Sequence, residues 1–273
     1  MKGNVKVELR NVQETLLLPL WGRAVETMKQ NPRLIDEKAV DIIESLDYDF
    51  STIVENISSV TQVSWIARSI HVDNMIKDFV ERNPRATIVD IGCGLDTTFE
   101  RMKDDRAQFY DLDLPEVIDL RKKFFKEHER RKMIPSSFLD TKWFDELAAG
   151  NGILFVAAGV FYYFQEEQVK RFFTSICAKF ARCEVFFDVA SPLGVKVANK
   201  RVIEDGGMEA SANLKWGIEN PKVIEKWDKR IKVVEEFPMF RGMKKGYSFK
   251  TKYGLWMSDF LRIMSMVHLR IKV

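Results

Sequence analysis

The chain has 273 residues, of which 46% are hydrophobic, 12% aromatic and 30% charged. This is the composition of an ordinary globular protein, and it excludes disordered, collagen-like and disulfide-scaffold classes. The 43 basic and 40 acidic residues are interspersed and leave a formal charge of only +3, which predicts no nucleic-acid partner. Three cysteines without metal-site spacing, Cys93, Cys177 and Cys183, predict a reduced, cytoplasmic protein with no disulfide and no metal centre.

The apolar stretches are short. The longest, residues 153–164, cannot cross the roughly 30 Å hydrocarbon core of a bilayer. Leu16–Leu20 is shorter still, and it follows Glu8 and Glu14 where a signal peptide carries positive charge. We therefore expect a soluble protein without a membrane partner.

The first third of the chain has a helical pattern. Apolar residues recur every three or four positions from Ile35 to Leu46, and again from Ile66 to Phe79. Asn83-Pro84 ends this pattern, because proline cannot continue the helical hydrogen bonds and disfavours the α conformation of the residue before it. This is the best boundary in the chain, and it divides residues 1–83 from residues 84–273.

Beyond that boundary, strands alternate with helices. Apolar and β-branched strands are predicted at 86–91, 108–112, 133–137, 153–158, 184–190, 231–237 and 266–273. Helices are predicted between them, near Thr97 or Thr98, from Pro115, over 169–180, and around Leu255, Phe260 and Ile263. This alternation predicts a mostly parallel sheet with helices on both faces, with its ligand at the carboxyl ends of the strands. Residues 201–220 interrupt the pattern and are predicted to form a flap over that edge.

The sharpest motif is Val89-Asp90-Ile91-Gly92-Cys93-Gly94-Leu95-Asp96, at the end of the first core strand. Its glycines allow a ligand to approach the backbone closely. A dinucleotide-binding loop needs a third glycine further along, where this chain has Thr97 or Thr98. The motif therefore favours a non-phosphorylated nucleoside.

Acidic segments follow the next two strands. Residues 110–115, about 20 positions after the glycines, supply a carboxylate that can accept hydrogen bonds from both ribose hydroxyls. Residues 138–141, with Trp143 beyond them, supply a carboxylate for an adenine amino group and apolar neighbours for its ring. Three consecutive strand ends thus predict an adenosine-shaped trough.

Together these motifs resemble the leucine carboxyl methyltransferase superfamily, in particular its polyketide-synthesis O-methyltransferase-like branch. The resemblance extends over nearly the whole chain and includes residues 18–24, Ala67-Arg68 with Asp73, residues 158–164 and residues 187–192. It implies an α/β fold, the class I methyltransferase Rossmann-like sheet with helices on both faces. It also implies a helical N-terminal cap over 1–83, a methyltransferase domain over 84–273 and S-adenosylmethionine as the cofactor.

The same resemblance assigns roles to individual residues. Gly92 and Gly94 would contact the methionine and ribose portions, Asp113 the ribose, and Asp140 with Thr141 the adenine. Arg23 and Arg68 would face the methionine carboxylate, an anion that the planar guanidinium suits. The cofactor-binding residues implied in this way are Arg23, Arg68, Gly92, Cys93, Gly94, Asp113, Asp140, Thr141 and Ala158.

Two positions depart from the family pattern. Many members have arginine directly after Gly-Leu-Asp-Thr, whereas this chain has Thr98 there and Arg101 one turn later, where it can take over a structural ion pair. The position before Gly159 is often glutamate and here is Ala158. The ammonium group of the cofactor must then find another acceptor, or the substrate geometry differs from that of the carboxyl methyltransferases.

Methyl transfer from a sulfonium is an in-line displacement, which depends on alignment and on the exclusion of water. A carboxylate acceptor is ionised at neutral pH, whereas a hydroxyl acceptor benefits from a general base. No catalytic residue is assigned, and the candidate bases are Tyr162, Tyr163, His71 and Asp188.

The sequence therefore predicts an S-adenosylmethionine-dependent O-methyltransferase that acts on a hydroxyl or carboxyl group of a small molecule. Three alternatives stay open: methylation of a protein C-terminal carboxylate, a catalytically silent S-adenosylmethionine-binding protein, and a nicotinamide dehydrogenase. The identity of the acceptor and the oligomeric state are not determined at this level.

Overall fold

The computed structural model of the chain describes residues 14–48, 50, 57–148, 150–200 and 213–272. Its centre is a seven-stranded sheet of order β3-β2-β1-β4-β5-β7-β6. The strands are β1 (Thr87–Ile91), β2 (Gln108–Asp113), β3 (Arg131–Pro135), β4 (Ile153–Ala157), β5 (Arg182–Ala190), β6 (Ile231–Pro238) and β7 (Met264–Lys272). Strands β1 to β5 pair in parallel, and β7 runs antiparallel to both β5 and β6. The predicted mostly parallel sheet is confirmed.

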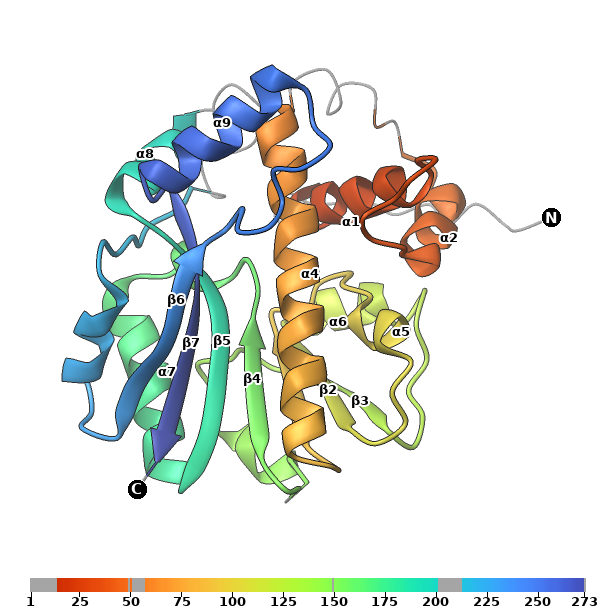
Figure 1. Cartoon of the computed structure of the whole chain (residues 1–273). Coiled ribbons are helices and arrows are strands. Elements are labelled where there is room, and N and C mark those ends of the chain that lie inside the picture. The colour runs from red at the N-terminus through yellow and green to blue at the C-terminus, as the bar shows by residue number, and fades with distance from the viewer. Residues whose placement is uncertain (1–13, 49, 51–56, 149, 201–212, 273) are drawn as a thin grey trace.

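Helices cover both faces of this sheet (Figure 1). The α-helices are α1 (Glu14–Thr27), α2 (Glu37–Ser45), α4 (Ser59–Arg82), α5 (Thr98–Met102), α6 (Pro115–Arg121), α7 (Glu166–Lys179), α8 (Pro192–Ala198) and α9 (Phe249–Phe260). Three short 3-10 helices are η1 (Lys142–Glu146), η2 (Phe161–Tyr163) and η5 (Pro221–Lys226). The helical pattern predicted between residues 34 and 80 thus corresponds to α2 and α4, which ends at Arg82 as the Asn83-Pro84 signal predicts.

Strand β4 shows why the two faces form. All five of its residues are buried, which is typical of a parallel strand covered on both sides. Because side chains alternate along a strand, Leu154 and Val156 pack in the core beneath α4. Ile153 and Phe155 pack in the opposite core, with the apolar stripe of α7. The uninterrupted apolar run and the helical spacing after it are therefore two parts of one layered structure.

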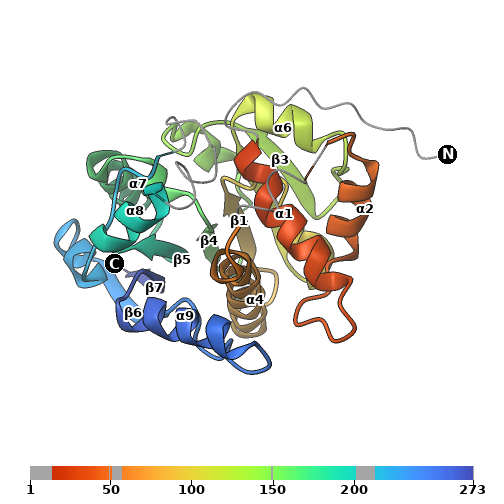
Figure 2. The same cartoon turned by 90° about the horizontal axis from the view of Figure 1, so that it is seen from above.

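The N-terminal segment contributes to the sheet's own core. Ile76, Phe79 and Val80 of α4 belong to the same buried cluster as Ile88 and Leu154 of the sheet. Figure 2 shows α4 end-on against the sheet, while α1 and α2 lie to one side of it. The division of the chain at residue 83 stays a prediction, since α4 shares its core with the strands that follow.

Two elements differ from expectation. Strand β3 begins at Arg131, two residues before the predicted Met133. The Arg131 guanidinium is buried and donates to Asp111 Oδ2 over 2.6 Å. Because a charged residue gives no apolar strand signal, the pattern did not include it. The last predicted helix is present as α9, but of its two apolar residues named from the sequence Leu255 is buried and Phe260 is 67% exposed. In the part of the chain that the structure describes, no helix is long and apolar enough to cross a membrane.

Candidate active site

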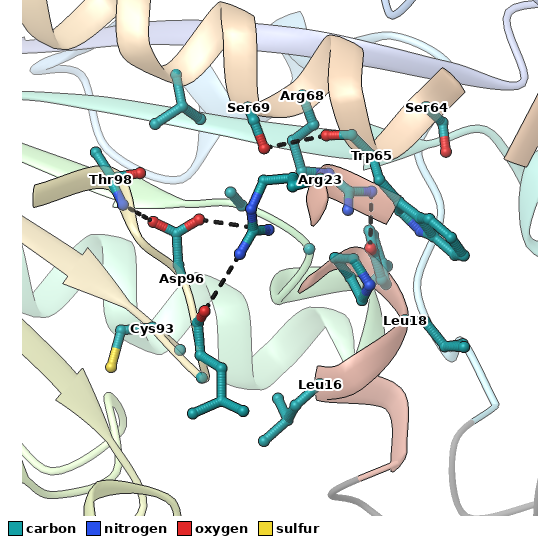
Figure 3. Close-up of a pocket in the computed structure, with 18 of the residues that line it drawn as sticks. Leu16, Leu18, Arg23, Ser64, Trp65, Arg68, Ser69, Cys93, Asp96 and Thr98 are labelled. Carbon is teal, nitrogen blue, oxygen red and sulfur yellow. Dashed lines mark hydrogen bonds and ion pairs between the residues drawn. The ribbon is translucent and has the colours of Figure 1, made fainter. Parts of the chain in front are cut away.

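A cavity of about 210 Å³ lies at the carboxyl ends of β1 and β4, beneath α1 and the first half of α4. This is the edge of the sheet at which the alternating pattern placed the ligand. Figure 3 shows side chains of α1, α4 and the turn after β1 converging on it. Eight of the residues implied by the sequence line it: Arg23, Arg68, Gly92, Cys93, Gly94, Ala158, Tyr162 and Tyr163.

The turn after β1 requires its glycines. Gly92 and Gly94 have φ angles of 64° and 45°, a region that other residues rarely adopt. A Cβ atom on Gly92 would lie 2.6 Å from Val160 Cγ2, and one on Gly94 would lie 2.8 Å from Leu16 Cδ2. The backbone of this turn can therefore approach α1 and the β4 loop only without side chains.

The carboxylate of Asp113 holds the neighbouring strand end against this turn. It accepts hydrogen bonds from Gly94 N and Leu114 N, both over 2.8 Å. Ser136 N in turn donates to the Asp113 carbonyl over 2.8 Å. The ends of β1, β2 and β3 are thus connected in the predicted order, although Asp113 itself lies outside the cavity lining.

Asp140 and Thr141 also lie outside the cavity lining and are exposed. Asp140 Oδ1 accepts a hydrogen bond from Lys142 N over 3.0 Å at the start of η1. Their contact with adenine stays a prediction. Trp143 does not contribute to this edge: it is 1% exposed and packs on Phe144 and Phe155 in the core.

Arg23 connects α1 to the turn after β1. Its Nε donates to Asp36 Oδ2 over 2.8 Å and its Nη2 to the Leu95 carbonyl over 3.2 Å. Nη1 lies 3.7 Å from Asp96 Oδ2, at the edge of the cavity (Figure 3). The guanidinium faces the cavity while it holds α1 over the strand ends.

Arg101 joins the same group of charges. Its Nε and Nη2 each donate to Asp73 over 2.9 Å, and its Nη1 donates to Asp36 over 3.1 Å. The structural ion pair expected of Arg101 is therefore present. Although burial alone raises the pKa of Asp96, the Arg101 and Arg23 guanidinium groups hold it below its ordinary value. We call this group the Arg23–Arg101 cluster: Arg23, Asp36, Asp73, Asp96 and Arg101.

Arg68, which also lines the cavity, is held by Asp188 of β5. Its Nε and Nη2 contact Asp188 Oδ2 at 2.9 and 2.7 Å, and the Asp188 side chain has no exposed area. Asp188 Oδ1 also accepts a hydrogen bond from Gly159 N over 2.6 Å. We call Arg68 and Asp188 the Arg68–Asp188 pair.

The candidate bases differ in position and state. Tyr162 and Tyr163 line the cavity, and burial raises the pKa of both phenols, so both are protonated at neutral pH. Tyr162 Oη accepts a hydrogen bond from Arg68 Nη2 over 3.2 Å. His71 lies outside the lining, with its Nε2 2.9 Å from the Met239 carbonyl oxygen, and burial lowers its pKa. Asp188 is fully occupied by Arg68 and Gly159 N.

Asp90 is a cavity residue to which sequence reasoning gave no role. It lines the cavity and is half-buried, and its side-chain carboxylate accepts no hydrogen bond from any residue that the structure describes. Burial, and then the nearby carboxylates Asp96 and Asp111, raise its pKa well above its ordinary value. An acidic residue inside an otherwise apolar strand was the signal available for it.

One face of α4 was also missed. Its cavity residues are Thr61, Ser64, Trp65, Arg68, Ser69 and Val72. These positions follow the three- and four-residue spacing of a single helical face. Apart from Arg68, which the family resemblance pointed to, this stripe of mostly small and polar residues was overlooked, because the helical pattern was read from the apolar residues alone.

Residues 17–177, more than half of the chain, match the family described as Leucine carboxyl methyltransferase. The protein belongs to this methyltransferase family. It is 28% identical over 235 residues, 85% of each chain, to the Tetracenomycin polyketide synthesis O-methyltransferase TcmP of Streptomyces glaucescens. It is 33% identical over 130 residues to the S-adenosyl-L-methionine-dependent methyltransferase dpfgK of Gibberella zeae, covering 45% of this chain and 44% of that relative.

A solved structure shows the same fold. The methyltransferase resembles a DUF574 family protein from Streptomyces avermitilis with a TM-score of 0.60 and 12% identity, over 97% of this chain and all of that one. The family and the two relatives show an S-adenosylmethionine-dependent methyltransferase, and the sheet has the α/β fold of class I methyltransferases, as the sequence predicted. The cavity fits such a cofactor. It combines the turn of Gly92 and Gly94, which allows close approach, with the guanidinium groups of Arg23 and Arg68. It also contains the Asp90 carboxylate, which has no hydrogen-bond partner among the described residues.

Proposed function

We propose that this methyltransferase transfers a methyl group to a carboxyl or acidic hydroxyl oxygen of a small molecule. S-adenosylmethionine supplies the methyl group. The observation that carries the proposal is the mixed lining of the cavity. Charged side chains and the backbone of the glycine turn line it together with five apolar side chains, those of Leu16, Leu18, Trp65, Leu214 and Met264.

The charged groups of the lining suit the amino-acid portion of the cofactor. Arg68 Nη1 donates to no described residue, and Arg23 Nη1 has only its 3.7 Å approach to Asp96. These two groups are available to bind the methionine carboxylate. Asp90 is available to bind the ammonium group, because it lies on β1 opposite Val156, two residues before Ala158. Asp90 would thus replace the glutamate that many family members have at the position of Ala158.

The apolar side chains of the lining suit the methyl acceptor. Trp65 offers an aromatic surface for a planar ring, and the surrounding aliphatic side chains exclude water from the reacting atoms. Both tyrosines are protonated, Asp188 is bound by Arg68 and Gly159 N, and Asp90 is assigned here to the ammonium group of the cofactor, so none of these four residues is left as a base for an aliphatic alcohol. An acceptor oxygen that is ionised in solution requires no such base. This favours carboxylates and acidic phenols.

The test is a methyl-transfer assay with radiolabelled S-adenosylmethionine and three acceptor groups: aromatic acids, phenols and peptides with a free C-terminus. We expect label in the small aromatic acceptors, released by mild alkali if an ester forms and retained if an ether forms. Label in the peptides alone would overturn the proposal in favour of a protein carboxyl methyltransferase. Tight binding of S-adenosylhomocysteine with no transfer to any group would indicate a silent cofactor-binding protein.

Asp113→Ala, which is expected to lose cofactor affinity, serves as the negative control for that assay. A matched positive control is Asp145→Ala, because Asp145 is an exposed acidic residue on η1 outside the cavity. Transfer that disappears with Asp113→Ala and persists with Asp145→Ala would tie the activity to this site.

A further inference from the structure

Helix α9 exposes a stripe of aromatic side chains. Phe249, Tyr253, Trp256 and Phe260 are 85%, 57%, 49% and 67% exposed. At 3.6 residues per turn, these four positions fall within an arc of about 60°. The Trp256 and Phe260 rings stack with centroids 5.3 Å apart. Thr251 and Leu255, on the opposite side of the helix, are buried. The outer face is therefore apolar and uncovered by the described part of the chain.

The charges around this stripe are basic. Between residues 241 and 263 the chain has six basic residues and a single acidic one, Asp259. Asp259 is already paired with Lys244, and Arg241 pairs with Glu235. Four exposed basic residues form no ion pair with a described residue: Lys245, Lys250, Lys252 and Arg262. The face thus combines exposed aromatic rings with unneutralised positive charge.

We propose that the outer face of α9 binds an anionic lipid surface. An amphipathic helix that lies in the plane of a bilayer buries aromatic side chains among the acyl chains and places lysines against the headgroups. A second copy of this chain is a poorer partner, because a symmetric contact through α9 brings the same unpaired cations together. The proposal does not depend on the identity of the methyl acceptor.

The position of α9 is consistent with this role. Figure 1 shows α9 on the outside of the molecule, at the end of the sheet toward which β4 points. Met264, which follows α9 at the start of β7, lines the cavity, and Thr251 Oγ1 is 3.2 Å from Ser59 Oγ at the start of α4. Contact through α9 would bring the cavity end of the enzyme to the lipid surface.

This inference departs from the expectation that the protein has no membrane partner. That expectation rested on the shortness of the apolar stretches, which concerns a span across the bilayer. A helix that lies on the surface needs only one apolar face, and the sequence placed Leu255 and Phe260 on one helix without deciding which of them is buried. The exposure of Phe260 is therefore the finding that changes the interpretation.

The test is flotation of the full chain with phosphatidylcholine vesicles that contain either no phosphatidylserine or about 30% of it. We expect binding to the anionic vesicles only, weakened by salt. The double substitution Trp256→Ser/Phe260→Ser should lower the partition coefficient about tenfold or more, since both rings leave the interface. Lys250→Glu/Lys252→Glu should abolish the preference for anionic vesicles.

The matched control is Met28→Ser/Val234→Ser, which removes two exposed apolar side chains away from α9 and should bind as the wild type does. Every variant is first shown to bind S-adenosylhomocysteine, so that loss of lipid binding is not loss of folding. Failure of the wild type to float, or equal flotation of the aromatic variant, would overturn the proposal. So would retention on a polyglutamate column without flotation, which would assign the face to an acidic protein. A dimer that the aromatic variant disrupts, without flotation, would assign it to a second copy.

Discussion

The two ion-paired groups at the cavity, the Arg23–Arg101 cluster and the Arg68–Asp188 pair, are built differently. The Arg23–Arg101 cluster combines two guanidinium groups with three carboxylates, and Asp36 contacts both arginines. The Arg68–Asp188 pair has one of each, and Asp188 also accepts the Gly159 N–H. When one member of the cluster is lost, oppositely charged groups remain in contact within it. When one member of the pair is lost, the other is left as an uncompensated buried charge.

This difference separates positions that stabilise the fold from positions available to a ligand. Guanidinium and carboxylate groups that are fully engaged with one another contribute to the free energy of unfolding. The Asp90 carboxylate and the Nη1 atoms of Arg23 and Arg68 have few or no partners among the described residues, and all three residues line the cavity. The following substitutions test this division, from the largest expected effect to the smallest.

Asp188→Asn should destabilise the protein most. Among the described residues, Asp188 supplies the only carboxylate that contacts Arg68, and breaking a buried pair in this way costs about 3–5 kcal/mol. Urea unfolding monitored by circular dichroism measures the change. The double variant Arg68→Met/Asp188→Asn should recover part of the loss because it leaves no unpaired charge. A single substitution that costs under about 1 kcal/mol would contradict the view that this pair lacks alternative partners.

Arg101→Met should have a smaller effect, about 2–3 kcal/mol, because Arg23 still contacts Asp36 and Asp96. The same unfolding measurement applies. Adding Asp73→Asn should restore stability, since Asp73 is the carboxylate that Arg101 binds through two bonds. A loss equal to that of Asp188→Asn would show that the cluster has no redundancy.

Asp113→Ala should weaken S-adenosylhomocysteine binding by about 1–3 kcal/mol through the loss of charged hydrogen bonds to the ribose. Calorimetric titration measures it, with urea unfolding as the check on folding. Asp113→Asn keeps an oxygen for Gly94 N and should lose less affinity. Unchanged affinity in the alanine variant would remove Asp113 from the ribose role.

Asp90→Asn should weaken binding of the cofactor by about 1 kcal/mol, because the ammonium group loses an ionic partner. Without cofactor, the same substitution should stabilise the protein at high pH. Because the folded state raises the pKa of Asp90, protonated Asp90 contributes stability at acid pH, and this contribution is lost as the pH rises through that pKa. Above it, the folded state holds an ionised carboxylate near those of Asp96, Asp111 and Asp113. Arg121 is the compensating charge among its neighbours. Thermal melts from pH 4 to pH 9 should show a variant advantage that grows with pH. A difference independent of pH would contradict this assignment.

Asp140→Ala should have the smallest effect, about 0.5–1 kcal/mol on cofactor affinity, because an exposed hydrogen bond to adenine competes with water. Titration beside Asp145→Ala gives the comparison, since Asp145 is equally exposed and has no expected contact with the cofactor. Equal affinities in the two variants would exclude Asp140 from the adenine site.

Much of the fold could be predicted because its signals are local. Asn83-Pro84 ends α4, the run 153–157 forms β4, and the positive φ angles of Gly92 and Gly94 shape the turn after β1. Each signal depends on a few adjacent residues and on the allowed backbone angles of proline, glycine and β-branched side chains. The glycine turn and the two cavity arginines were found for this reason, or through family resemblance.

The rest of the site depends on contacts between distant parts of the chain. Arg68 and Asp188 are 120 positions apart, and Arg101 and Asp73 are 28 apart. A charged residue carries no mark in the sequence of whether it will face a partner, a ligand or water, as Asp90, Arg131 and His71 show. Helix α9 makes the same point with apolar residues, because its spacing predicts an amphipathic helix but not which ring is buried.

The sequence by itself thus determined the alternation of strands and helices, the close-approach turn and the cofactor class. Only the tertiary structure decided which charges neutralise one another, which remain open to the cavity, and which face of α9 is left uncovered by the described residues. The physical reason is that backbone preferences act over neighbouring residues, whereas burial and ion pairing depend on what the folded chain brings alongside each side chain.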